Sequence, residues 1–366
     1  MTEEQKRREE YWLWICSMKE IYRPAIARLI RYFGNPGAVY EAPEKEIRNS
    51  GCLNDVQTEA LLRGRAGWDA EESSHELKER GITFISAEHE DFPERLKQIY
   101  DCPFGIFYRG RLPEKNGKTA GIVGARRCSS YGKQMAECLA ASLAGCGVQI
   151  ISGMAWGIDG YAQTAALDAG GESFAVLGSG VDVCYPAGNR NLYHRLEKEG
   201  GILSEYPPGR EALALHFPMR NRIISGLSDV LLVIEAKERS GSLITADQAI
   251  EQGKDVYAVP GRIGDPLSAG CNRLISQGAG IVLSENELLL TLNLIEEKQK
   301  KNKKVVNPLE TKENMLYSCL DLHPKSLHEI VGRVQLPVQE VLSLLTVLEM
   351  KGFIKEPMKN YYSRIN

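Results

Sequence analysis

The chain has 366 residues, 43% of them hydrophobic, which suits two or three folded domains and excludes a mini-protein or a fibre. Its 45 basic and 48 acidic side chains give a formal net charge of -3, which excludes a histone-like positive field over the whole molecule. Any contact with nucleic acid must therefore be local. The polar start and the short apolar runs argue against a signal peptide and a membrane span, so we expect a cytoplasmic protein.

The nine cysteines are scattered and form no Cys-x-x-Cys pair. An odd number of cysteines in apolar segments favours buried free thiols over disulfides or a zinc site. We expect no metal site and no cofactor.

Residues 1–100 predict a small helical module. Short amphipathic helices are expected at 11–17, 25–33 and 55–62, separated by turns rich in glycine and asparagine.

Between residues 101 and 295 the pattern changes to that of an α/β domain with a mostly parallel, Rossmann-like sheet. Short apolar runs end in glycine or serine and are followed by amphipathic helices. We expect strands at 119–123, 148–152, 173–177, 201–204, 229–234 and 255–259. We expect helices between them, including 131–144, 158–169 and 242–252.

A lysine-rich polar stretch at 296–308 indicates a linker, and a final domain is expected at 309–366. Helices near 315–320, from 326 and over 338–351, with a turn at 335–337, precede two strand-like segments. This order is typical of a winged helix-turn-helix.

Two predicted strands end in turns suited to a phosphate. The first continues into Gly124, Arg126 and Ser129, where backbone amides, a positive helix end and an arginine meet. The second ends at Gly153, with a further glycine at Gly157 that would let the backbone approach a ligand. Ordinary tight turns between strand and helix remain an alternative for both.

Arg220, Asn221 and Arg222 open a helix, where cations oppose the helix dipole. This placement indicates a nearby anion, although salt bridges to Asp229 or Glu235 are an alternative. Before them stands Phe217, which offers a face for a stacked base or else serves as a core aromatic.

Ser240, Gly241 and Ser242 follow another strand and open another helix, so they offer hydroxyls and amides to an anion. Because loops at the carboxyl ends of parallel strands meet in one crevice, we expect these four loops to converge. Residues 118–290 hold 15 Lys and Arg against 18 Asp and Glu, yet several arginines crowd these loops. The pattern predicts a focused groove for an anionic polymer or a phosphorylated small molecule.

A catalytic set is not evident, because neither histidine of the α/β domain, His194 or His216, stands beside a nucleophile with an orienting acid. Asp159 and Glu235 are expected to cap loops and pair with arginines. We therefore expect no enzymatic turnover.

The motifs together resemble those of the DNA-processing protein A family (DprA, also called Smf). The similar segments cover the α/β domain in order: GAR at 124–126, SSYG at 129–132, SGMAWGID at 152–159, VLGSGVDVCYP at 176–186, Ser204-Glu205, FPMRNRIISGLSDVLLVIEA at 217–236, SGSLITA at 240–246, VPG at 259–261 and Gly270-x-Asn272. The flanking modules are similar too, since family members often carry a SAM-like or helix-hairpin-helix module before the sheet and a winged helix after it.

The resemblance implies a dimeric protein that binds single-stranded DNA without turnover, protects it, and loads the recombinase RecA in natural transformation or recombination. By motif match, Arg126 would hold a phosphate, Arg220 and Arg222 would line the groove, and Phe217 and Asn221 would contact bases or sugar. Ser240, Gly241 and Ser242 would present hydroxyls and amides to a phosphate.

Trp156 and Gln163 depart from the pattern, because the family commonly has arginine and histidine there.

Two alternatives remain open. A nucleotide-binding enzyme or sensor similar to the phosphoribohydrolases would use the same crevice, but their Pro-Gly-Gly-x-Gly-Thr run is incomplete at 260–265. The winged helix could instead read DNA sequence, but Lys351 is the one cation in its presumed recognition helix, which suits protein contact better.

Overall fold

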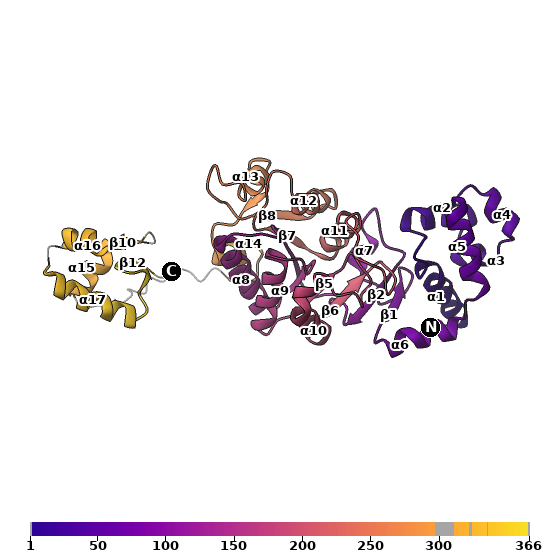
Figure 1. Cartoon of the computed structure of the whole chain (residues 1–366), viewed down its shortest axis with the longest axis horizontal. Coiled ribbons are helices and arrows are strands. Elements are labelled where there is room, and N and C mark those ends of the chain that lie inside the picture. Colours follow the sequence, from indigo (N-terminus) through magenta and orange to yellow (C-terminus); the bar gives the residue numbers. More distant parts are fainter. Residues whose placement is uncertain (1, 297–310, 322–323, 335, 365–366) are drawn as a thin grey trace. The chain divides into compact units, whose positions relative to one another are not determined.

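The computed structural model describes residues 2–296, 311–321, 324–334 and 336–364 (Figure 1). It divides into two compact units, Met1–Glu296 and Glu297–Asn366. Apart from Glu296, the predicted linker lies outside the described residues, as does the predicted start of the last domain at residue 309.

A nine-stranded sheet forms the centre of the first unit, in the order β1-β2-β6-β5-β4-β3-β7-β8-β9. Its strands are β1 (Thr83–Ser86), β2 (Gly105–Gly110), β3 (Thr119–Val123), β4 (Gln149–Ser152), β5 (Ser173–Val176), β6 (Gly201–Ser204), β7 (Val230–Val233), β8 (Asp255–Ala258) and β9 (Gly280–Ile281). The seven strands β6, β5, β4, β3, β7, β8 and β9 are parallel to one another, whereas β2 pairs antiparallel with both β1 and β6. The predicted mostly parallel α/β sheet is confirmed, and all six predicted strands belong to it.

Helices cover both faces of this sheet, as its apolar strands require. They are α7 (Glu94–Lys97), α8 (Ser130–Gly145), α9 (Ile158–Asp168), α10 (Arg190–Glu199), α11 (His216–Leu227), α12 (Gly241–Glu251), α13 (Ala269–Ser276) and α14 (Glu285–Thr291), with a 3-10 turn at Ala187–Asn189. Ile122 of β3 packs in the same apolar cluster as Leu139 of α8, whereas its neighbour Val123 packs in the cluster that holds Ile223 of α11. Successive strand residues thus alternate between two apolar layers.

The strand order reverses direction at β3. From β3 the chain adds β4, β5 and β6 on one side, and then returns to place β7, β8 and β9 on the other. The loops that leave β3 and β7 therefore diverge at the carboxyl edge of the sheet, which is where open α/β sheets form a ligand crevice.

The N-terminal part of this unit is helical and lies beside the edge formed by β1 and β2 (Figure 1). Its helices are α1 (Glu3–Cys16), α2 (Arg23–Phe33), α3 (Pro36–Glu41), α4 (Glu44–Asn49), α5 (Asp55–Ala66) and α6 (Ala70–Glu79). Its centre includes Trp14, Leu29 and Leu61, all buried.

Strand β1 falls in the stretch that the sequence analysis assigned to helices. Its residues pair in register with β2, and Glu9 of α1 accepts hydrogen bonds from both the backbone N–H and the hydroxyl of Ser86 at 2.6 and 2.5 Å. The helices and the sheet edge are thus tied together by a charged hydrogen bond as well as by apolar contact.

The second unit has the predicted winged-helix order. Helices α15 (Thr311–Cys319), α16 (Leu327–Val334) and α17 (Val338–Met350) pack on one another around Leu316, Ile330 and Leu345. A small sheet of β10 (Lys325–Ser326), β12 (Tyr361–Arg364) and β11 (Ile354–Met358) forms the wing. Within the described part of the chain, no single helix is long and apolar enough to cross a membrane, and α16 with α17 meets those criteria only as a bent pair.

Candidate functional site

A pocket of about 650 Å³ opens at the carboxyl edge of the sheet, where β3 and β7 diverge. We call it the groove pocket. Its walls come from all four loops that the sequence analysis singled out, together with the loop after β5. They include Gly124, Arg126, Ala155, Asp159, Tyr185, Phe217, Arg220, Asn221, Arg239, Ser240, Gly241 and Ser242.

Arg126 and Phe217 lie next to each other in the lining of the groove pocket. The Arg126 guanidinium lies 5.0 Å from the centre of the Phe217 ring, and Tyr185 stands next to that ring at 5.5 Å between centroids. Arg126 is exposed, so its charge can meet a phosphate while its planar group stays on the aromatic face. Cation and aromatic surfaces together suit a chain that alternates phosphates and bases.

Arg220 lies deeper and links the ends of two strands. Its guanidinium donates to the carbonyl of Gly153 after β4, at 3.1 Å, and to the carbonyl of Val176 at the end of β5. Burial lowers the pKa of Arg220 to about 10, so the side chain remains charged at neutral pH. It therefore adds positive potential to the floor of the pocket while fixing the positions of the strand ends.

Asp159 is the acidic group of this floor. Burial raises the pKa of its carboxyl, an effect that the nearby Arg220 charge and a hydrogen bond from the Gly153 N–H at 3.2 Å oppose. Asp159 thus orders the loop after β4, in agreement with the loop-capping role expected from the sequence.

The N-terminus of α12 forms the opposite wall. The Ser240 hydroxyl caps the helix and lies 2.8 Å from the hydroxyl of Ser242, and the Asn221 amide donates to the carbonyl of Gly241 at 3.2 Å. The first amides of a helix have no partner within it, and the helix dipole makes this end positive. With Arg239 exposed beside it, this wall has the chemistry of an anion site.

Three of the predicted site residues, Ser129, Gly153 and Arg222, do not line the groove pocket. Ser129 caps α8, and both its backbone N–H and its hydroxyl donate to Glu235, at 2.9 and 2.5 Å. Gly153 acts through its backbone, and a Cβ there would meet the Arg220 guanidinium at 2.6 to 2.8 Å.

Arg222 is directed away from the groove pocket, contrary to its predicted place in the lining. Its guanidinium forms a two-pronged ion pair with Glu205 at 2.7 and 2.8 Å and also donates to the carbonyls of Asp101 and Met219. The Arg222 side chain is only 5% exposed. The salt-bridge alternative therefore applies to this arginine, with Glu205 rather than Asp229 or Glu235 as the partner.

The loop after β4 is shaped by internal contacts. Gly157 has a φ of 78°, and a Cβ there would meet the Ala125 carbonyl at 2.3 Å, so this position needs glycine. Gln163 is buried, accepts from the Met154 N–H at 3.0 Å and donates to Ser173 at 3.1 Å. This departure from the family pattern thus serves the fold, whereas Trp156 is 52% exposed, outside the groove pocket.

Tyr185 is the site residue that the sequence analysis missed. It is 44% exposed and lies next to Phe217, so it adds a second aromatic ring to the groove pocket. The motif at 176–186 that contains Tyr185 begins at the end of an apolar strand, and this placement could have indicated that Tyr185 lies near the site.

All nine cysteines are free thiols, but only Cys16, Cys52 and Cys271 are buried, so the expected burial holds for three of them and the other six are partly exposed. Among the described residues no group of three or more His, Cys, Asp or Glu side chains is placed to hold a metal ion. In the second unit, Lys351 at the end of α17 pairs with Glu313 at 2.8 Å.

Two family models match the chain. That of DNA recombination-mediator protein A covers residues 83–293, and that of the DprA winged helix domain covers residues 301–356.

Curated relatives carry names of the same kind. The chain is 46% identical over 198 residues to the DNA processing protein DprA of Streptococcus pneumoniae, a match that covers 54% of this chain and 70% of that protein. It is 44% identical over 284 residues to the protein Smf of Escherichia coli, covering 77% of this chain and 75% of that protein.

Two solved structures are similar as well. The X-ray structure of DprA from S. pneumoniae matches with a TM-score of 0.66 at 36% identity, over 77% of this chain and 97% of that one. A DprA structure from Helicobacter pylori, described for its single-stranded DNA binding mode, matches with a TM-score of 0.54 at 29% identity, over 58% of this chain and 95% of that one.

Proposed function

The chain belongs to the DNA recombination-mediator protein A family, and from that premise we propose that it binds single-stranded DNA in the groove pocket. The observation that carries this proposal is the meeting of Arg126, Phe217 and the α12 N-terminus in one pocket at the carboxyl edge of the sheet. Guanidinium groups and helix amides would bind phosphates, and aromatic rings would stack on bases.

The chemistry of this pocket is tolerant of sequence. Phosphate contacts give no information about the base, and every base offers a face for stacking. The proposed binding is therefore sensitive to salt and insensitive to base order, with log affinity falling by about 0.7 per neutralised phosphate for each log unit of salt.

We further propose that the chain has no enzymatic turnover, acts as a homodimer, and protects single-stranded DNA while loading the recombinase RecA in natural transformation or related recombination. This role follows the family resemblance. The α/β domain proposed at 101–295 would hold the strand, and the modules proposed at 1–100 and 309–366 would serve other contacts in the cytoplasm.

Fluorescence anisotropy with labelled oligo-dT across a salt series tests the binding proposal. Tight binding that grows with strand length and weakens steeply with salt is the expected result. Binding of mononucleotides with equal affinity would instead favour the nucleotide-binding alternative, which the family matches above do not support.

A filament assay tests the recombinase proposal separately. RecA is added to strands coated with single-strand-binding protein, with and without this chain. We expect faster RecA filament formation in its presence, and an unchanged rate alongside normal oligo-dT binding would reject the loading role alone.

A further inference from the structure

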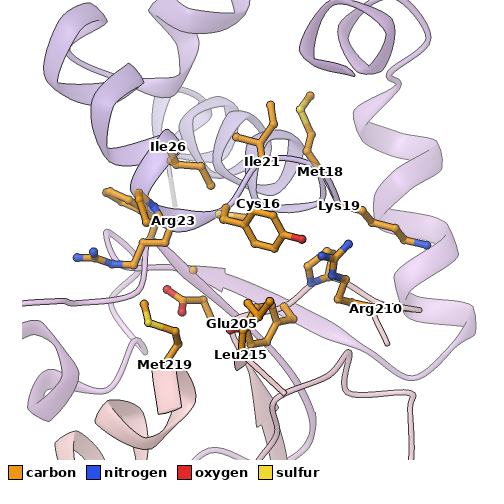
Figure 2. A pocket seen from close by; sticks show the side chains of 16 residues that line it. Cys16, Met18, Lys19, Ile21, Arg23, Ile26, Glu205, Arg210, Leu215 and Met219 are labelled. Atoms are coloured by element: carbon orange, nitrogen blue, oxygen red, sulfur yellow. The ribbon is translucent and has the colours of Figure 1, made fainter. Parts of the chain in front are cut away.

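A second pocket, distinct from the groove pocket, lies where the N-terminal helices meet the sheet domain. It has a volume of about 250 Å³ and is bordered by the end of α1, the start of α2, the segment after β6 and the start of α11. Figure 2 shows Ile21 and Ile26 on one side of the opening and Leu215 and Met219 on the other. We call it the α2 pocket.

The α2 pocket has mainly apolar walls. Leu215 and Met219 are 61% and 40% exposed, so two large apolar side chains at the start of α11 remain open to solvent. Burial raises the pKa of Cys16, so its thiol is neutral and adds to the apolar surface. An open apolar hollow of this kind favours a ligand with an apolar body over water.

The charges around the α2 pocket are unbalanced. Two of them are neutralised locally, because Arg23 pairs with Asp101 at 3.0 Å and Glu205 pairs with Arg222 at 2.7 Å. Lys19 and Arg210 also border the pocket, and among the described residues neither has an acidic partner within ion-pair distance.

Arg210 is also incompletely bonded. Its guanidinium lies 4.9 Å from the centre of the Tyr22 ring, and its buried Nε has no hydrogen-bond partner in the described part of the chain. The guanidinium of Arg210 therefore has neither an ion-pair partner nor a full set of hydrogen bonds among the described residues, which leaves its charge available to an anion. The wall thus combines an apolar surface, an aromatic ring and two unneutralised cations.

We propose that the α2 pocket binds a small organic acid with a compact aromatic or branched apolar body and one carboxylate. The carboxylate would lie between Lys19 and Arg210, and the apolar body would lie among Ile21, Ile26 and Met219. A dry cavity of about 150 Å³ holds benzene, so the volume of the α2 pocket suits a body of about ten heavy atoms. Met219 borders the α2 pocket and Phe217, two residues earlier on α11, borders the groove pocket, so the two pockets lie about half a helical turn apart on this helix.

The test uses the full chain with 13C-labelled methionine and isoleucine methyl groups, titrated with 3-phenylpropionate and with its uncharged isostere 3-phenylpropanamide. Saturable shifts of the Met18, Ile21, Ile26 and Met219 methyl signals are expected for both ligands. The acid should bind about threefold or more tightly than the amide, since each unneutralised cation adds a modest attraction at a partly exposed site. Equal affinities, or shifts confined to other methyl groups, would overturn the proposal.

Variants separate charge from shape. Lys19→Glu with Arg210→Glu should abolish the preference for the acid and leave the weaker amide binding. Met219→Trp should fill the hollow and abolish the shifts with both ligands. The control Lys45→Glu with Arg63→Glu makes the same charge change at two exposed positions on α4 and α5 that do not border the pocket, and it should keep the preference. If the control loses the preference to the same extent, a general charge effect explains the data and the site is rejected.

Discussion

Replacing Arg222 tests whether this residue stabilises the fold through its buried ion pair with Glu205 or binds DNA in the groove pocket. We expect Arg222→Ala to lower the free energy of unfolding of the first unit by about 3 to 5 kcal/mol, the usual cost of leaving one partner of a buried pair without the other. The structure supports a value in this range, because the side chains are 5% and 14% exposed and joined by two hydrogen bonds at 2.7 and 2.8 Å. The truncation also removes donors from two backbone carbonyls, of Asp101 and Met219.

Urea unfolding followed by tryptophan fluorescence measures this loss. All four tryptophans, Trp12, Trp14, Trp68 and Trp156, belong to the first unit, so the signal reports on that unit alone. Replacing both partners, as Arg222→Met with Glu205→Leu, should recover at least half of the loss, because no buried charge is then left alone.

Binding of oligo-dT is measured on the same variants at a temperature where they remain folded. Since Arg222 does not line the groove pocket, the affinity should stay within about twofold of the parent chain, which is less than the loss of one hydrogen bond would cause. A stability loss below about 1 kcal/mol, the range of an exposed pair, together with a large loss of oligo-dT affinity, would refute this assignment of Arg222.

Three further predictions concern the groove pocket and its surroundings. Phe217→Ala should weaken oligo-dT binding by about 5- to 150-fold in anisotropy measurements, the effect of losing one stacked base, and an unchanged affinity would exclude stacking on this ring. Gly153→Ala should displace the Arg220 guanidinium, because the new Cβ would lie 2.6 to 2.8 Å from it, and should weaken binding; a crystal structure with Arg220 in its original place and unchanged affinity would contradict this. Burial lowers the pKa of His216 in the folded chain. As the pH falls, the unfolded chain therefore binds this proton before the folded chain does. The free energy of unfolding should decrease as the pH drops below about 6.5. The neighbouring Arg210 charge also lowers this pKa. His216→Gln can keep the hydrogen bond to the Gly178 carbonyl, which is 3.0 Å long in the parent chain, and should make the free energy of unfolding, measured with urea, less dependent on pH in this range. An equally steep pH dependence in the variant would assign the titration to another group.

Local patterns were enough to predict six of the seven parallel strands, and the one that was missed, β9, is only two residues long. β3 was predicted at its observed bounds because its five residues are apolar or small and lead into a glycine turn. The convergence of the loops followed from the same reasoning, since carboxyl ends of parallel strands share one edge. β1 was missed because four residues next to a helix-rich stretch carry little signal, and their pairing with β2 depends on a partner about twenty residues away.

The individual roles of the arginines could not be read from the sequence. Arg220 and Arg222 stand two residues apart on α11, yet one borders the groove pocket and the other reaches Glu205 at the end of β6. That choice depends on how α11 is rotated against the sheet, which is set by contacts of Ile223 and Ile224 with residues distant in the sequence. Tyr185 was missed for a similar reason, because its contact joins the loop after β5 to Phe217 on α11, which is distant in the sequence.

The account depends most on phosphate binding by the exposed loop after β3, and a matched pair of neighbouring arginines tests it. Arg126 lines the groove pocket, whereas Arg127, which is also exposed, does not. Oligo-dT affinity measured across a salt series should show that Arg126→Ala reduces the slope of log affinity against log salt by about 0.7, whereas Arg127→Ala keeps the parent slope. Equal slopes for the parent chain and Arg126→Ala, or the larger change in Arg127→Ala, would contradict the proposed groove.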